Sequence, residues 1–397
     1  MNEPRTADNC IYFDNAATSF PKPPAVTEAV VDYMTRVGGN PGRSGHPLSV
    51  RAGEIVFSAR EAVASLFGVS HPMHVIFCSN ATEALNLAIL GITREGDHVI
   101  TTGMEHNSTF RPLTELERRG RITLSMVPCS RAGIIDRVAL EKTITGETRL
   151  MVVNHASNVN GTVQPLREIS AICRKKNIIL IADCAQSAGV VDIDMGDDGI
   201  DLLAFSGHKG LYGPTGTGGL VISDGFDASM LVPLKYGGTG SYSEKPIQPP
   251  FLPDRFESGT LNAAGISGML AGIEHIRNTV PGGLKEVREH KKALVAHFLE
   301  EASKRVPGFI SYTPADLLNT GVVSFNIRPN APSSIAGILA DTYGIMCRAG
   351  LHCAPLAHQT LGTFPRGTVR FSFSIFNTVD EIDTALDALE EITRREI

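Results

Sequence analysis

The sequence predicts an α/β fold in which a large domain with a mostly parallel sheet is followed by a smaller α+β domain. Short runs of consecutive apolar residues alternate with helical stretches over the first two thirds of the chain. Apolar runs without polar alternation are typical of strands that are covered on both faces, as in a parallel sheet. After about residue 262 the pattern changes to long helices, and a length of 397 residues suits one large domain and one smaller one.

Six strands are expected in the large domain, each short, apolar and bounded by turn residues. They lie at residues 74–78, 98–101, 149–155, 178–184, 201–205 and 219–223. A helix is expected to begin near Thr82, directly after the first strand. Residues 237–254 are rich in Gly, Ser and Pro and are expected to form a long loop, and such loops are often functional.

The C-terminal part is expected to be a smaller α+β domain that mixes helices and strands. Two long helices are predicted first, after about residue 262, and the second runs from 284 to 304 with charged and apolar residues at helical spacing. The elements expected after them are a strand at 321–327, a helix at 334–343, strands at 345–348 and 368–373, and a final helix that starts with a capping box of Thr378 and Glu381. We therefore predict domains at 16–265 and at 266–397, the second joined by residues 1–15.

Charge, hydropathy and cysteine content narrow the class of function. A net charge of −6 argues against a dedicated nucleic-acid binder and favours a small-molecule substrate. The polar start and the lack of apolar runs approaching ~18 residues indicate a cytoplasmic protein without membrane attachment. The seven dispersed cysteines contain no Cys-x-x-Cys pair, which argues against a disulfide framework and against a metal site. A single cysteine in the right setting can still be a nucleophile.

A lysine and a carboxylate end two of the predicted strands. Lys209 follows the strand at 201–205 in the sequence Ser-Gly-His-Lys, and Asp183 ends the strand at 178–184. Taken alone, Lys209 could be a surface lysine and Asp183 a helix N-cap. Both lie where open α/β sheets bind ligands, however, and pyridoxal phosphate (PLP) needs this pair. The lysine amine forms a Schiff base with the aldehyde, and the carboxylate keeps the ring nitrogen protonated.

Further residues could complete a PLP site. The turn at 79–83, which includes Ala81 and the Thr82 hydroxyl, precedes a helix and offers backbone donors to a phosphate. Ser206 and His208 flank the lysine and could add donors. Two more side chains could reach the ring, Gln186 at its hydroxyl and His106 on its face. A lone histidine is more often structural, so His106 gains its weight from the rest of the set.

Taken in order along the chain, these residues resemble the class V aminotransferase-like PLP enzymes, and within them the group II cysteine desulfurases and selenocysteine lyases. The matching runs are YFDNAAT at 12–18, MEHN at 104–107, HASNV at 155–159, DCAQ at 183–186, SGHK at 206–209, RFESGT at 255–260 and RAGLHCA at 348–354. The resemblance covers nearly the whole chain. It implies the PLP-dependent transferase fold type I and a homodimer with shared active sites.

The resemblance also implies a role for each matching residue. The implied PLP contacts are Lys209 as the Schiff-base lysine, Asp183 at the pyridine nitrogen, His106 on the ring, Gln186 at the ring oxygen, Asn158 nearby, and Thr82, Ser206 and His208 at the phosphate. Thr260 would reach the phosphate of the partner subunit. Arg370 would bind the substrate carboxylate, with Arg348 and Asn158 near the substrate.

Cys353 is the implied sulfur acceptor of a cysteine desulfurase, which converts L-cysteine to L-alanine. Its thiol would take the sulfur as a persulfide. The sulfur would then pass to an acceptor, for example an acceptor protein. The neighbouring Arg348 and His352 are expected to favour the thiolate as positive groups. The alternative for Cys353 is a buried core cysteine, which is the reading that we give to most of the other six, Cys347 included.

Three departures from the family pattern mark a divergent subgroup. Leu351 stands where group II members usually have a histidine, Gly210 is an extra glycine after the lysine, and the turn at 80–82 has fewer hydroxyl groups. Three alternative functions remain open on the sequence. They are a selenocysteine lyase, a PLP-dependent lyase, epimerase or aminotransferase that does not use the thiol, and a non-catalytic sulfur carrier with the same fold.

Overall fold

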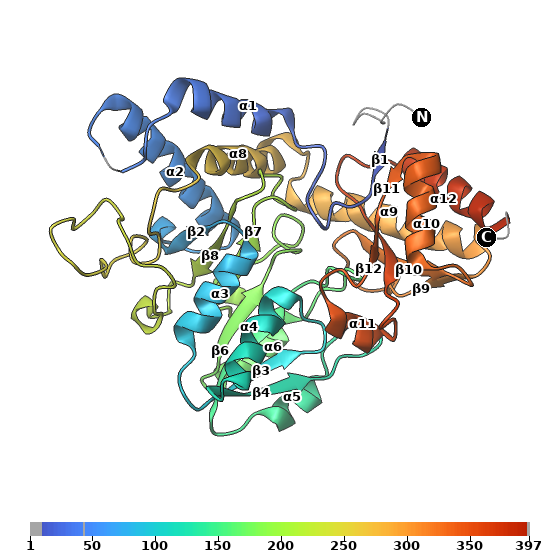
Figure 1. The fold of residues 1–397 in the computed structure, drawn as a ribbon, viewed down its shortest axis with the longest axis horizontal. Coiled ribbons are helices and arrows are strands. Elements are labelled where there is room, and N and C mark those ends of the chain that lie inside the picture. The colour runs from blue at the N-terminus through green and yellow to red at the C-terminus, as the bar shows by residue number, and fades with distance from the viewer. Residues whose placement is uncertain (1–9, 43, 395–397) are drawn as a thin grey trace.

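The structure is a computed structural model that describes residues 10–42 and 44–394. Within this part of the chain the strands form a seven-stranded sheet, a four-stranded sheet and a two-stranded sheet. Figure 1 shows the large sheet with helices packed around it, and the smaller sheets beside it together with the C-terminal helices. No helix in this part of the chain has both the length and the hydropathy that crossing a bilayer requires.

The large sheet confirms the predicted α/β class. Its strands, in spatial order, are β2 (Val75–Cys78), β8 (Gly218–Ile222), β7 (Leu202–Ser206), β6 (Ile179–Asp183), β5 (Thr148–Asn154), β3 (Asp97–Thr102) and β4 (Ile122–Val127). All neighbours pair in parallel except at β8, which runs antiparallel to both β2 and β7. Six of these strands match the expected ones, and β4 is an additional strand at the edge.

Both faces of this sheet are buried, as the apolar runs predicted. Alternate residues of one strand enter different cores, so that Met151 and Val153 of β5 face one core while Leu150 and Val152 face the other. Two long helices, α2 (Pro47–Leu66) and α8 (Ala263–Glu274), contribute to the first core. The helix α3 (Ala81–Ile92) dominates the second. The remaining helices of this region are α1 (Pro24–Asp32), α4 (Asn107–Arg118), α5 (Arg137–Thr143), α6 (Leu166–Arg174) and α7 (Met195–Asp198).

The smaller unit has an antiparallel sheet and a separate aromatic core. The sheet order is β12 (Arg348–Gly350), β13 (Thr368–Ser372), β10 (Val322–Ile327) and β9 (Phe309–Ser311). The helices around it are α9 (Leu284–Arg305), α10 (Pro332–Ile338), α11 (Pro355–Leu361) and α12 (Val379–Arg394). Rings of Phe298, Phe325 and Phe371 pack with centroids 5.0–5.3 Å apart at its centre. The predicted capping box is confirmed, because Glu381 N donates to Thr378 Oγ1 (3.2 Å) and Thr378 N donates to Glu381 Oε2 (3.0 Å).

Two segments join the units. Near the N-terminus β1 (Ile11–Tyr12) pairs in parallel with β11 (Ile345–Met346), so the first described residues belong to the smaller unit, as Figure 1 shows. The long helix α9 places Val287 in the first core and Leu294 in the aromatic one. The division into domains at 16–265 and 266–397 stays a prediction.

Candidate active site

The residues that the sequence singled out meet in one cavity of about 300 Å³. It lies at the carboxyl ends of β6 and β7, and the smaller unit closes it through β12 and β13. Twelve of the thirteen predicted site residues line it: Ala81, Thr82, His106, Asn158, Asp183, Gln186, Ser206, His208, Lys209, Arg348, Cys353 and Arg370. A parallel sheet brings the ends of distant strands to one edge, which explains why residues so far apart in sequence converge.

Lys209 and Asp183 form the buried end of the cavity. Burial lowers the pKa of Lys209 from 10.5 to about 8, against the opposing effect of the Asp183 carboxylate. Asp183 is 3% exposed, and burial raises its pKa while a hydrogen bond from Ala185 N (2.9 Å) opposes that shift. Part of the Lys209 population is therefore a neutral amine near neutral pH, next to a carboxylate that can hold a proton at a partner nitrogen.

A close backbone contact sets the turn that carries Lys209. A Cβ atom at Gly210 would lie 2.3 Å from the Ala188 carbonyl oxygen, and one at Gly189 would lie 2.3 Å from the Gly210 carbonyl oxygen. Only glycine fits at such an approach. The extra glycine after the lysine therefore has a local structural reason in this chain.

The part of the cavity wall formed by the start of α3 and the residues before Lys209 is suited to an anion. The twelve-residue helix α3 begins at Ala81, whose N–H lies 3.4 Å from Ser206 Oγ. Thr82 Oγ1 lies 2.7 Å from Ser108 Oγ, and His208 Nδ1 is buried with no hydrogen-bond partner among the described residues. Free N–H groups at a helix start, hydroxyl groups and an unpartnered ring nitrogen together form a set of phosphate donors.

Neutral and amide side chains line the middle of the cavity. His106 caps α4, with its Nδ1 accepting from Ser108 N (3.1 Å), and burial lowers its pKa to about 4 with a further contribution from Lys209. Gln186 Nε2 donates to the Ala16 carbonyl (2.9 Å). Asn158 Nδ2 donates to the His352 carbonyl (2.7 Å), and its Oδ1 is buried without a partner. His106 is thus an uncharged ring that can stack on an aromatic ligand.

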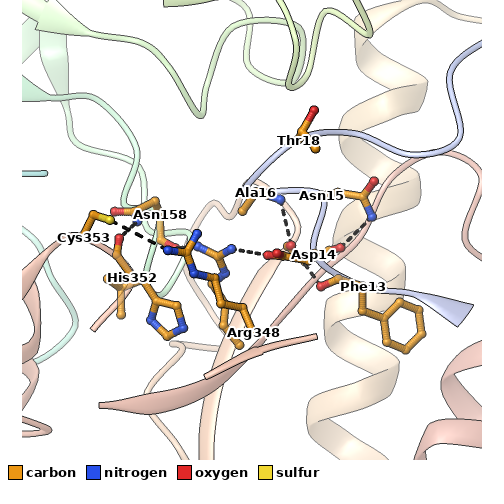
Figure 2. Close-up of polar contacts among 12 residues, drawn as sticks. Phe13, Asp14, Asn15, Ala16, Thr18, Asn158, Arg348, His352 and Cys353 are labelled. Carbon is orange, nitrogen blue, oxygen red and sulfur yellow. Dashed lines mark hydrogen bonds and ion pairs between the residues drawn. The ribbon is translucent and has the colours of Figure 1, made fainter. Parts of the chain in front are cut away.

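Two arginines lie side by side on the small-unit wall. Arg348 and Arg370 are register partners on β12 and β13. Arg370 is buried and forms an ion pair with Asp14, while its Nη1 donates to the Asn158 carbonyl (3.1 Å). Arg348 Nη2 lies 3.8 Å from the sulfur of Cys353, and Figure 2 shows Asp14 and Cys353 on opposite sides of Arg348. No role was predicted for Asp14 from the sequence, although the run at 12–18 contains it.

Cys353 is an exposed thiol in a left-handed turn. His352 and Cys353 have φ angles of 51° and 57°, and Ala354 N donates to the Leu351 carbonyl across them (2.9 Å). Asn107 N also donates to the Cys353 carbonyl (2.8 Å). These contacts hold the thiol at the mouth of the cavity beside the Arg348 guanidinium.

The expectation that His352 supplies positive charge to this thiol is wrong. His352 is 3% exposed, and burial lowers its pKa well below the ordinary value, with Arg370 contributing. Its Nδ1 lies 3.2 Å from His358 Nε2, and His358 Nδ1 lies 2.7 Å from Thr363 Oγ1. Thr363 Oγ1 donates to the His358 carbonyl (3.4 Å), so it accepts the hydrogen bond from His358 Nδ1. His358 Nε2 is then unprotonated and accepts from His352 Nδ1. With its proton on Nδ1, His352 has an unprotonated Nε2. Arg348 is the cation beside the thiol.

The other cysteines lie in less reactive surroundings. Burial raises the pKa values of Cys129, Cys173 and Cys347 to about 12. It also raises those of Cys78 and Cys184, while Cys10 is partly buried. Of the seven, Cys353 is the one that is exposed at the cavity.

Thr260 lies away from this cavity. It lines a separate depression with Glu83, Lys235 and Ser258. Its role toward a partner subunit stays a prediction.

Two buried side chains at the cavity were given no role from the sequence. Asn154 lines the cavity. Glu105 accepts a hydrogen bond from Asn154 N (3.1 Å), and burial raises the pKa of Glu105 to about 8.

The chain is similar to known proteins in both sequence and structure. The sequence profile described as "Aminotransferase class-V" matches residues 11–385. A "Probable cysteine desulfurase" of Pyrococcus abyssi is 36% identical over 394 residues, which cover 97% of this chain and 94% of the relative. One of Methanothermobacter thermautotrophicus is 35% identical over 386 residues, covering 96% and 94%. The apo structure of a cysteine desulfurase from Thermococcus onnurineus NA1 superposes over 100% of both chains, with a TM-score of 0.90 and 33% identity.

Proposed function

The chain belongs to the class V aminotransferase family, and we propose that it is a PLP-dependent cysteine desulfurase that converts L-cysteine to L-alanine. In this proposal the sulfur passes to Cys353 as a persulfide. The observation that carries it is the meeting of a partly buried lysine, a buried carboxylate and an exposed thiol around one cavity. A PLP enzyme that uses no thiol would not need Cys353 at this place.

The residues of the cavity fit PLP. Lys209 would hold the cofactor covalently, Asp183 would face its ring nitrogen, and His106 would stack on its ring. The unpartnered His208 Nδ1 and the start of α3 would take its phosphate, together with Thr82 and Ser206. When bound, PLP supplies an aldehyde for the substrate amine and a ring that accepts the electron pair released at the substrate Cα.

The arginines would hold the amino acid. Arg370 would bind the α-carboxylate through its planar set of donors, with Asn158 beside it. Arg348 would lie near the substrate sulfur, since its guanidinium is next to Cys353. This arrangement orients the Cα proton toward Lys209 and the sulfur toward the thiol.

Two side chains would then carry out the transfer. The Lys209 amine removes the proton from Cα and later returns a proton to the product. The Cys353 thiolate attacks the substrate sulfur, so that a sulfur–sulfur bond forms as the Cβ–S bond breaks, and Cβ retains the electron pair of that bond. Protonation of this carbon gives the methyl group of alanine. The Arg348 guanidinium, whose Nη2 lies 3.8 Å from the Cys353 sulfur, would hold this side chain in place for the attack.

The assembly is part of the same proposal. Thr260 would reach the phosphate of a partner subunit in a homodimer, which is the role that the family resemblance implies for it. Cys353 at the mouth of the cavity is accessible to a sulfur-acceptor protein. The seven cysteines are dispersed along the sequence without a Cys-x-x-Cys pair, which suits a reducing compartment and favours the cytoplasm.

Product analysis tests the proposed reaction. The PLP-loaded protein is incubated with L-cysteine and a thiol reductant, and alanine and sulfide are measured. Equal amounts of both are expected. Release of pyruvate and ammonia would instead indicate an eliminating lyase, and formation of 3-mercaptopyruvate when a 2-oxo acid is added as amino acceptor would indicate a transaminase. Parallel runs with selenocysteine and cysteine sulfinate rank the three substrates, and turnover of selenocysteine alone would indicate a selenocysteine lyase.

The lowered pKa of Lys209 predicts how fast the cofactor-free protein takes up PLP at different pH. The neutral amine is the form that reacts, so below its pKa of about 8 the rate should rise about tenfold per pH unit. Above pH 8 the rate should level off, whereas an ordinary lysine would keep gaining reactivity up to its pKa near 10.5. Stopped-flow absorbance after mixing with PLP measures this. A rate that still rises steeply between pH 8.5 and pH 10 would contradict the pKa shift.

A further inference from the structure

The Arg370 guanidinium carries an internal counter-ion that no step of the proposed reaction uses. The side chain of Arg370 is 1% exposed, and its Nη2 forms an ion pair with Asp14 Oδ1. Among the described residues, Asp14 is the acidic side chain that pairs with this arginine. An arginine buried to this degree requires a counter-charge, because a lone cation is poorly solvated in the protein interior.

The backbone around Asp14 is fixed against the strand that carries Arg370. Asp14 forms an isolated parallel bridge with Ser372. Ser372 N donates to the Phe13 carbonyl (2.7 Å), and Ala16 N donates to Ser372 Oγ (2.8 Å). Asn15 Nδ2 adds a hydrogen bond to the Ser372 carbonyl (2.8 Å). The Asp14 carboxylate therefore has a defined position relative to β13.

Asp14 contacts Arg370 without itself lining the cavity. The cavity wall includes Arg370, and the neighbouring Ala16, but not Asp14. The guanidinium is held at two corners, by Asp14 at Nη2 and by the Asn158 carbonyl at Nη1 (3.1 Å). Its Nε is buried and has no partner among the described residues. The planar group is thus anchored at two nitrogens while a third keeps its N–H free.

Arg348, the arginine next to Arg370, differs from it in its charged partners. Arg348 lies directly opposite Arg370 in the β12–β13 register, and two like charges at such a position repel. Among the described residues Arg348 forms no ion pair with an acidic side chain, and its Nη2 lies 3.8 Å from the Cys353 sulfur. Asp14 neutralises one member of the pair and leaves the other free for the thiol.

We propose that Asp14 is a positioning residue for substrate recognition, which orients the Arg370 guanidinium so that its free donors bind the substrate α-carboxylate. This inference rests on the proposed function, in which Arg370 binds that carboxylate. It predicts that loss of Asp14 weakens binding of ligands with a carboxylate and leaves binding of the amine end unaffected. A purely structural ion pair would tie residues 13–16 to β13 and affect both kinds of ligand equally.

Two matched ligands separate these roles. L-Alanine and ethylamine share the amine and differ by the carboxylate, and the absorbance change of the PLP-loaded protein reports binding of each. With Asp14→Asn the dissociation constant for L-alanine should rise about tenfold, and with Asp14→Ala by roughly 10- to 100-fold, the range for losing a hydrogen bond to a charged group. The constant for ethylamine should change less than about twofold. With L-cysteine, KM should rise by the same factor as the alanine constant while kcat stays within about threefold.

Two further variants complete the test. Asp192→Asn makes the same chemical change at an exposed ion pair with Arg288 and should leave both constants unchanged. Arg370→Gln should remove the preference for L-alanine altogether. If Arg370→Gln removes the preference for L-alanine but Asp14→Asn leaves that preference intact, or strengthens alanine binding, then Asp14 does not position the arginine. If Arg370→Gln itself keeps the preference, the carboxylate assignment of the proposed function is at fault. Should the Asn and Ala proteins not fold, Asp14→Glu, which moves the carboxylate by one methylene, must still lower the preference.

Discussion

The Lys209→Ala protein is expected to lose the visible absorbance of a lysine-bound cofactor and to lose turnover with L-cysteine. Lys209 would both hold PLP covalently and move the proton at Cα. General acid–base catalysis alone contributes typically 10²–10⁴-fold, so a loss of roughly 10³-fold or more is expected. Absorbance spectra of the purified protein and alanine release measure the two effects. Lys209 is the one lysine among the described residues that line this cavity, so no second lysine is placed there to take over the role.

A surface lysine provides the control for this variant. Lys304 lies on α9, where it pairs with Glu300 at an exposed position. Lys304→Ala should keep both the spectrum and the rate, since exposed ion pairs contribute only about 0 to 1 kcal/mol. Normal turnover by Lys209→Ala, or an unchanged visible band, would overturn the assignment of the cofactor lysine.

Cys353→Ser is expected to separate substrate binding from sulfur transfer. The variant should still bind PLP and L-cysteine, because those steps depend on Lys209, Asp183 and Arg370. Alanine release should fall by at least about 10²-fold, because a serine hydroxyl is a far weaker nucleophile than a thiolate at neutral pH. Spectra recorded after addition of L-cysteine report binding, and alanine analysis reports transfer. Selenocysteine turnover is measured in parallel, because selenium leaves more easily and need not depend on the thiol.

The position of the transferred sulfur gives an independent measurement. Wild-type protein incubated with L-cysteine without reductant should gain the mass of one sulfur on the peptide that contains Cys353, and a thiol reductant should remove it. Cys347→Ala provides the matched control six residues away, since burial raises the pKa of Cys347 to about 12. It should retain both activity and the added mass. Full alanine release by Cys353→Ser, or sulfur found on Cys184 or Cys347, would show that another group is the acceptor.

Much of the fold could be predicted from the sequence, because the central strands are apolar on both faces. This pattern identified β6 and β7 and the edge of the sheet that carries Asp183 and Lys209. The same uniform pattern contains no information about direction, so the antiparallel course of β8 could not be predicted from it. The edge strand β4 was missed because its middle residues are partly exposed and its apolar signal is weak.

The candidate site was predictable where a residue ends a strand or begins a helix. Asp14 shows the limit of this approach, because its partner Arg370 lies 356 residues away and only the folded chain brings them together. His352 shows a second limit. Its position next to Cys353 suggested a cation, but charge depends on burial, and burial holds this imidazole in its neutral form.

The left-handed turn at His352 and Cys353 has a consequence for protein engineering. A residue with a Cβ atom costs about 1 to 2 kcal/mol in this backbone region, and two occur in succession. Glycine at the exposed Cys353 would relieve that cost and make the protein more resistant to heat, whereas glycine at the buried His352 would also remove its contact with His358. A directed-evolution campaign that screens only for thermal tolerance would therefore favour replacement of the Cys353 thiol. Screens on this scaffold should score sulfur release in every round, since the most stable turn and the reactive turn require different residues.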